Sequence, residues 1–236
     1  LRNPDLGGGA ILDIGCYPLT MCKLIAGHLQ GLPFAEPKEF SATGELDETG
    51  VDLQSHAHII FSDSIEAKIS CAINENFSND LLVSSGEKSI AVNQPWHCGQ
   101  FQDGRSSILV STPQLGKQEI SFIDEFGLFS REIEHASSCI LQQKAESEFI
   151  THTETQSNMF WLDQWRERMK IECPKNSLKN SPISLSNTSQ IRKPILKKIT
   201  LPRINKIGSR LALGCDNQTS DLHAFTMFDH FYESGG

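Results

Sequence analysis

An aspartate and a tyrosine four residues apart, Asp13 and Tyr17, are the pair near the start of the chain best suited to chemistry. They follow three consecutive glycines, at positions 7–9, and lie within an apolar run. This pattern predicts a turn that leads into a buried helix, with Gly27 at its end. Side chains four apart lie on one face of a helix, so a carboxylate and a phenol there can share a ligand. The same pair is equally suited to a buried hydrogen bond that ties the helix to a neighbouring loop.

The sequence Gly-Gly-Gly-Ala-Ile-Leu-Asp-Ile-Gly at positions 7–15 resembles the start of the C-terminal domain of the Gfo/Idh/MocA oxidoreductases. A tyrosine four residues after the aspartate resembles the branch that contains glucose-fructose oxidoreductase and dihydrodiol dehydrogenase. The resemblance covers residues 1–174 and implies that Asp13 and Tyr17 face the substrate as catalytic residues. It also implies an NAD(P) cofactor, bound mainly by an N-terminal Rossmann domain that carries a Gly-rich loop and a Glu-Lys-Pro lysine.

Interconversion of an alcohol and a carbonyl requires a group that exchanges a proton with the reacting oxygen. Tyr17 is suited to that role, or to donating a hydrogen bond to the oxyanion, and Asp13 is suited to orienting a substrate hydroxyl. The chain contains neither Glu-Lys-Pro nor Gly-x-Gly-x-x-Gly. We therefore expect the cofactor domain to lie upstream, and the 236 residues alone to bind cofactor weakly or not at all and to lack turnover.

Two further groups of residues are weaker candidates. Trp96 and His97 lie in a loop between predicted strands, where they would border the substrate, or else pack under the sheet edge. His56 and His58 alternate along a strand and so share a face, as some metal ligands do. No third ligand is evident, so we interpret them as a solvent-facing row and predict no metal site.

Composition narrows the class of protein. The chain has 38% apolar residues, a net charge of −8, no apolar run long enough to cross a membrane and no signal-peptide pattern. Its seven cysteines form no Cys-x-x-Cys pair, which favours reduced thiols and a cytoplasmic protein. A first residue other than methionine suggests that upstream sequence is missing. We expect a small-molecule substrate related to sugars or polyols, and neither nucleic acid nor membrane as a partner.

The elements that must position these residues form an α+β fold. Alternating apolar residues predict strands at 38–43, 51–62, 64–74, 81–84, 89–92, 107–111 and 118–123. Short links between them predict an open, largely antiparallel sheet with helices on one face. A core-facing stripe of one helix is predicted from Phe126, Phe129, Ile133, Ala136 and Ile140, and a second helix is predicted at 155–171. The resemblance implies a homo-oligomer that forms through the exposed sheet face.

The composition changes after residue 174. Residues 175–206 are rich in Ser, Asn, Lys and Pro and predict a flexible, basic linker. Residues 207–236 predict a strand and then a helix whose apolar face carries Ala224, Met227, Phe228 and Phe231. With the final Gly235-Gly236, this unit resembles the opening βα unit of aldo/keto reductases. We therefore expect a fusion of two oxidoreductase domains. The alternative to oxidoreductase activity is a non-catalytic assembly or scaffold module within a larger fusion protein.

Overall fold

The computed structural model describes residues 1–4, 7–97, 104–123, 129–171, 199–201 and 206–208. The chain divides into two units, Leu1–Asn180 and Ser181–Gly236. The helices of the first unit are a π-helical turn at Ile11–Gly15, α1 (Cys16–Leu29), a 3₁₀ turn at Pro95–His97, α2 (Ser130–Leu141) and α3 (His152–Arg168). Its strands are β1 (Glu39–Leu46), β2 (Asp52–Ser62), β3 (Ile65–Ala72), β4 (Asp80–Ser85), β5 (Lys88–Asn93), β6 (Arg105–Thr112) and β7 (Gly116–Ile123).

The strands of the first unit are all antiparallel and form two sheets, β1-β2-β3 and β4-β5-β6-β7. The predicted fold class, antiparallel strands with a few helices, is confirmed, although the hydrogen bonding divides the predicted single sheet into two. Sequential hairpins build both sheets, as the short links indicate.

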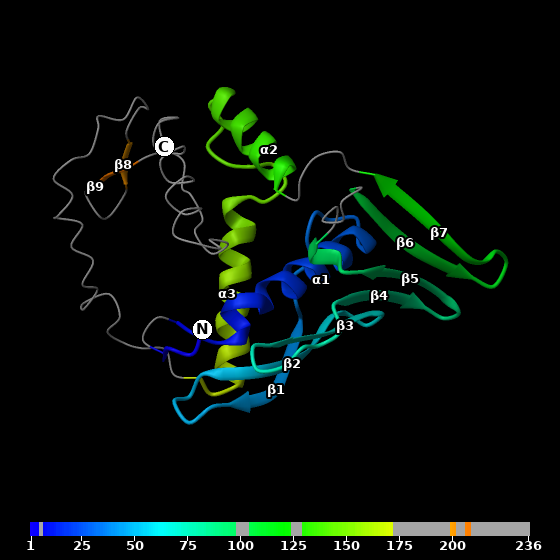
Figure 1. The fold of residues 1–236 in the computed structure, drawn as a ribbon, viewed down its shortest axis with the longest axis horizontal. Helices are drawn as coiled ribbons and strands as arrows, with labels where there is room; N and C mark the ends of the chain where they lie inside the picture. The colour runs from blue at the N-terminus through cyan, green and yellow to red at the C-terminus, as the bar shows by residue number, and fades with distance from the viewer. Residues whose placement is uncertain (5–6, 98–103, 124–128, 172–198, 202–205, 209–236) are drawn as a thin grey trace. The chain divides into compact units, whose positions relative to one another are not determined.

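The β1-β2-β3 sheet carries the core of the chain. Residues of β2 alternate between the two faces, and Ala57, Ile59 and Phe61 are buried while His56 is exposed. Helices α1 and α3 and the π-helical turn contact the apolar face of this sheet (Figure 1). The core therefore lies between this sheet and the helix that carries the candidate residues.

The β4-β5-β6-β7 sheet also has an apolar face. The strand register places eight apolar side chains on it: Leu81, Val83, Ile90, Val92, Ile108, Val110, Ile120 and Phe122. None of them is buried, and Ile120 and Phe122 are 47% and 51% exposed. Helices of the described residues do not bury this face.

Two predictions about helices are wrong. Ile133, 64% exposed, and its neighbours on α2 do not face a core, because no α2 residue is buried. Helix α1 continues past Gly27, which lies against the backbone of Phe34, where a Cβ would come within 2.5 Å. Gly31 follows the end of α1 with φ 72°, a conformation that suits glycine. The helix predicted at 155–171 is present as α3.

The second unit is described only at two strands, β8 (Ile199–Leu201) and β9 (Lys206–Gly208), which pair antiparallel. The rest of the predicted linker at 175–206, and residues 209–236 of the βα unit predicted at 207–236, fall outside the described residues. The domain boundaries and the aldo/keto reductase resemblance therefore stay predictions. None of the described helices is long and apolar enough to cross a membrane.

Candidate active site

The glycines at the start of the chain allow the candidate helix to lie against the first residue of β2. Gly9 has φ 127°, and a Cβ on it would lie 2.0 Å from Oδ1 of Asp52. Oδ2 of Asp52 accepts a hydrogen bond of 2.7 Å from the backbone N–H of Ile11, in the first turn of the helix. Asp52 thus binds a backbone N–H that has no partner within the helix.

Asp52 is almost fully buried, with 1% of its surface exposed. Burial raises the pKa of its carboxyl group, and the hydrogen bond from Ile11 opposes that rise. Sequence reasoning missed this residue. Its signal was the single acidic residue of the predicted strand 51–62, between the apolar residues Val51 and Leu53.

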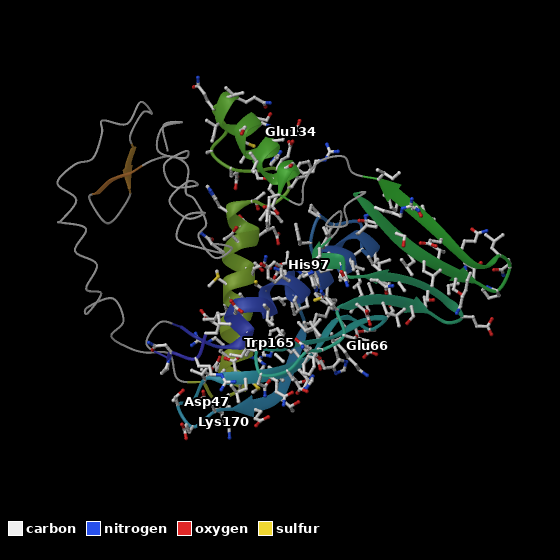
Figure 2. The ribbon with its side chains drawn as sticks, viewed as in Figure 1. Asp47, Glu66, His97, Glu134, Trp165 and Lys170 are labelled. Carbon is white, nitrogen blue, oxygen red and sulfur yellow. The ribbon has the colours of Figure 1, made fainter. Side chains whose placement is uncertain are left out.

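Asp13 lies in the π-helical turn Ile11–Gly15, and Tyr17 lies in the first turn of α1. Both side chains are exposed, Tyr17 by 53%. Single π-helical turns are frequent at functional sites. Gly15 is buried in the same turn. A Cβ added there would lie 3.2 Å from the indole ring of Trp165, which Figure 2 labels on α3. The turn therefore packs closely on α3 while it presents Asp13 to solvent.

The structure brings three of the four predicted site residues to one region. The rings of Tyr17 and Trp96 lie 5.9 Å apart between centroids, at 44°. His97, next in the chain, accepts a 3.2 Å hydrogen bond at Nδ1 from the Asn79 amide. The 3₁₀ turn that holds Trp96 and His97 begins after Gln94. Gln94 has φ 50°, a strained value for a residue with a side chain. No hydrogen bond joins Asp13 to these three residues within the described chain.

A polar pair from two helices lies beside this region. The Asn158 amide on α3 donates a 3.1 Å hydrogen bond to Oγ1 of Thr20, which follows Tyr17 by three residues on α1. Oδ1 of Asn158 is buried and has no hydrogen-bond partner among the described residues. Sequence reasoning found no signal in Asn158, because its contact joins residues 138 positions apart.

A buried lysine fixes α1 against α3. Lys23 is 0% exposed, hydrogen-bonds to Ser157, and lies 3.2 Å from the carboxylate of Glu36 and 3.6 Å from that of Glu154. Partial burial raises the pKa of Glu36, but hydrogen bonds from Ser157 and Trp161 and the charge of Lys23 outweigh it, so the pKa lies below its usual value.

Lys23 was also missed from the sequence, although a signal existed. It follows Leu19 by four residues and precedes Ala26 by three, so it stands in the buried stripe of α1. A lysine there requires buried partners, since an unpaired buried charge is costly.

The two strand histidines have other partners than a metal. Nδ1 of His56 lies 2.8 Å from the hydroxyl of Ser70, and Nε2 of His58 lies 2.7 Å from a carboxylate oxygen of Glu66. These contacts are made on the exposed face of the β1-β2-β3 sheet. The described residues contain no cluster of three or more His, Cys, Asp or Glu side chains that could hold a metal ion.

A hollow in the described surface lies away from these residues. Gly8, Gly50, Arg166 and Lys170 are among its lining residues, whereas none of the predicted site residues lines it. It lies at the C-terminal end of α3, where Figure 2 labels Lys170. The Tyr17 region is the better candidate site, because the aromatic and polar groups suited to substrate chemistry lie there.

The fold is shared with a ketoreductase and a dehydrogenase of known structure. The 3-ketoreductase KijD10 from Actinomadura kijaniata, in complex with NADP and TDP-benzene, matches with a TM-score of 0.52 and 15% identity, over 68% of this chain and 46% of that chain. UDP-N-acetylglucosamine 3-dehydrogenase GnnA from Acidithiobacillus ferrooxidans matches with a TM-score of 0.51 and 14% identity, over 70% of this chain and 50% of that chain. Identity this low shows the fold alone.

Among curated proteins the chain is similar to trans-1,2-dihydrobenzene-1,2-diol dehydrogenases. The Bos taurus enzyme is 27% identical over 172 residues, which are 72% of this chain and 49% of that protein. The Sus scrofa enzyme is 23% identical over 176 residues, with the same coverage. The predicted likeness to dihydrodiol dehydrogenases is thereby confirmed, and the chain spans about half the length of the curated relatives it matches. No protein-family model matches the chain.

Proposed function

We propose that this chain is the substrate-binding half of an NAD(P)-dependent oxidoreductase that interconverts an alcohol and a carbonyl on a sugar, a cyclic polyol or a related ring. One observation carries the proposal. The helix that presents Asp13 and Tyr17 holds the exposed Tyr17 ring against Trp96, next to His97. Its sequence relatives are dihydrobenzenediol dehydrogenases, and its structural relatives are a 3-ketoreductase and a UDP-N-acetylglucosamine 3-dehydrogenase.

Each residue has a distinct role in this proposal. The Tyr17 hydroxyl exchanges a proton with the reacting oxygen, or donates a hydrogen bond to it as negative charge develops. Asp13 accepts a hydrogen bond from a second substrate hydroxyl. The Trp96 ring packs on the apolar C–H face of a ring substrate, and His97 lies at the rim of the same region.

The described residues do not fit a dinucleotide. Their strand pairs are all antiparallel, so they contain no parallel βαβ unit of the kind that holds a dinucleotide. Gly9, in the glycine cluster, lies against Asp52, a carboxyl group that would repel phosphate when ionised. A nicotinamide cofactor supplies hydride transfer when bound. We propose that a separate cofactor domain of the whole protein binds it, and that the 236 residues alone lack turnover.

The apolar face of the β4-β5-β6-β7 sheet supports the proposed homo-oligomer. Eight apolar side chains share this face and none is buried. Large exposed apolar surfaces commonly mark interaction sites. The same face favours the second candidate function, a non-catalytic assembly module, because assembly through it does not depend on Tyr17.

Turnover of the whole protein separates the two functions. In steady-state assays with NAD(P) and a panel of cyclic diols and sugars, we expect Tyr17→Phe to lower kcat by roughly 100-fold or more, since a positioned acid–base group contributes that much. His28→Ala, at an exposed position of the same helix, is the matched control and should retain the wild-type rate. Unchanged turnover in Tyr17→Phe would return Asp13 and Tyr17 to a structural role, and no turnover by the wild-type protein on any substrate would favour the assembly module.

A further inference from the structure

One end of the β4-β5 hairpin holds Asn79 beside the turn that carries Trp96 and His97. Asn79 immediately precedes β4, and its backbone carbonyl accepts a 2.7 Å hydrogen bond from the N–H of Gln94, which immediately follows β5. The carbonyl of Gln94 in turn accepts a 3.0 Å hydrogen bond from the N–H of His97. Backbone hydrogen bonds therefore position Asn79 and His97 relative to one another.

The contact between the two side chains determines where a neutral imidazole carries its proton. Nδ2 of Asn79 lies 3.2 Å from Nδ1 of His97, and both residues are half-buried. An amide nitrogen can only donate, so Nδ1 accepts this hydrogen bond. A neutral imidazole has one N–H group, and with Nδ1 as the acceptor that group is at Nε2. Asn79 thus selects one of the two tautomers of His97.

The second ring nitrogen of His97 is available to a ligand. Nε2 has no hydrogen-bond partner within the described chain, and it is not buried. His97 directly follows Trp96, whose ring lies 5.9 Å from the ring of Tyr17 between centroids. An open N–H donor therefore lies next to the two aromatic rings of the proposed site.

We propose that Asn79 is a positioning residue, which holds His97 in the Nε2-protonated tautomer so that His97 donates a hydrogen bond to an oxygen of the bound substrate. The identity of this ligand rests on the proposed function, whereas the tautomer does not. A fixed donor matters most for an oxygen that can only accept, such as a carbonyl oxygen. A hydroxyl group is less demanding, since it can rotate either to accept or to donate. His97 thereby determines specificity for the carbonyl form of the substrate.

NMR of the isotope-labelled 236-residue chain tests the tautomer, through proton–nitrogen correlations within the imidazole rings at about pH 9, where histidine is ordinarily neutral. We expect the His97 proton on Nε2. Asn79→Asp should move it to Nδ1, because a carboxylate only accepts and so requires a donor at that nitrogen. Asn76→Asp is the matched control, since it adds the same charge at an exposed position of the same loop and should leave the tautomer unchanged. His97→Gln, which removes the ring, assigns the signal.

Two NMR results would overturn the inference. One is a wild-type chain with the His97 proton on Nδ1, because Nε2 would then accept and not donate. The other is an Asn79→Asp chain that keeps the proton on Nε2, because Asn79 would then not control the tautomer. Neither measurement requires a cofactor or turnover, so both are independent of the proposed function.

Steady-state kinetics of the whole protein at the same pH test the contact with substrate, with a cyclic ketone in the reductive direction and the matching alcohol in the oxidative direction. We expect Asn79→Asp to raise KM for the ketone about tenfold, the effect of one lost hydrogen bond. KM for the alcohol should change much less, because its hydroxyl can donate to the bare Nε2. Asn76→Asp should change neither value. His97→Leu should resemble Asn79→Asp for the ketone, and His97→Gln, whose amide supplies a donor, should restore most of the loss.

The kinetic outcomes separate a specific role from a structural one. A purely structural effect of Asn79→Asp would raise both KM values together, and this result, or an unchanged KM for the ketone, would overturn the contact with a carbonyl oxygen. A wild-type protein without turnover on any substrate would contradict the proposed function and the substrate contact together. In that case the NMR result alone would still establish whether Asn79 sets the tautomer of His97.

Discussion

In the β1-β2-β3 sheet the apolar face is buried under helices, whereas in the β4-β5-β6-β7 sheet no residue of the apolar face is buried. Both sheets are antiparallel and both alternate apolar and polar residues. Ile59 in the first sheet is 0% exposed, and Ile120 in the second is 47% exposed. Alternation therefore determines which side chains share a face. Whether that face is covered depends on contacts made far away in the sequence.

The covered sheet should lose most when its central contact is removed. Trp165 is 0% exposed and donates a 2.7 Å hydrogen bond to Ser55 on β2. We expect Trp165→Ala to lower the free energy of unfolding by about 3–5 kcal/mol, as for other buried aromatic truncations. Phe122→Ala in the open sheet should cost less than about 1 kcal/mol in a monomer. Urea unfolding measures both, and equal losses would contradict the contrast between the sheets.

A smaller loss of stability is expected where the turn that begins the Asp13 helix contacts Asp52 of the covered sheet. Gly9→Ala places a Cβ against Asp52 and requires φ 127°, so it should lower the free energy of unfolding by roughly 1–3 kcal/mol. Gly50→Ala is the matched control, since φ there is also positive, at 83°, but no atom lies within 4 Å of the added Cβ. Thermal unfolding compares the two variants. A loss in Gly50→Ala as large as that in Gly9→Ala would show that only backbone strain matters.

The smallest effect on unfolding is expected at the surface of the open sheet, where assembly is the more sensitive measurement. Ile120 and Ser121 are both exposed and point to opposite faces of β7. Ile120→Glu should dissociate the proposed oligomer with a change of less than about 0.5 kcal/mol in the monomer, and Ser121→Glu should leave the oligomer intact. Sedimentation velocity reports the mass. An unchanged mass in Ile120→Glu, or a monomeric wild-type protein, would contradict assembly through this face.

Local patterns predicted much of this fold. Alternation identified the strands, and the glycine run located the helix of Asp13 and Tyr17. The π-helical turn around Asp13 and the end of α1 beyond Gly27 were not predicted, because both depend on packing against Trp165 and Phe34. For α2, spacing alone identified the helix and overestimated its burial.

The residues of the candidate site likewise fall into those that were predicted from the sequence and those that were not. Tyr17 and Trp96 were singled out by residue type and motif, and the structure places their rings in contact. Asp52, Lys23 and Asn158 were not predicted, because each has a hydrogen-bond partner between 41 and 138 residues away. Single polar residues inside apolar patterns were the available signal. Such a residue indicates that a buried partner exists, but the pattern does not identify which residue the partner is.

The buried ammonium of Lys23 has a consequence for how α1 can move. A slide of α1 along α3 by one helical turn, about 5.4 Å, would take the charge away from Glu36, Glu154 and Ser157 and leave it unpaired in the core. The helix therefore has one permitted register. Because Tyr17 lies on the same rigid helix, that register also fixes the position of its hydroxyl in the proposed site.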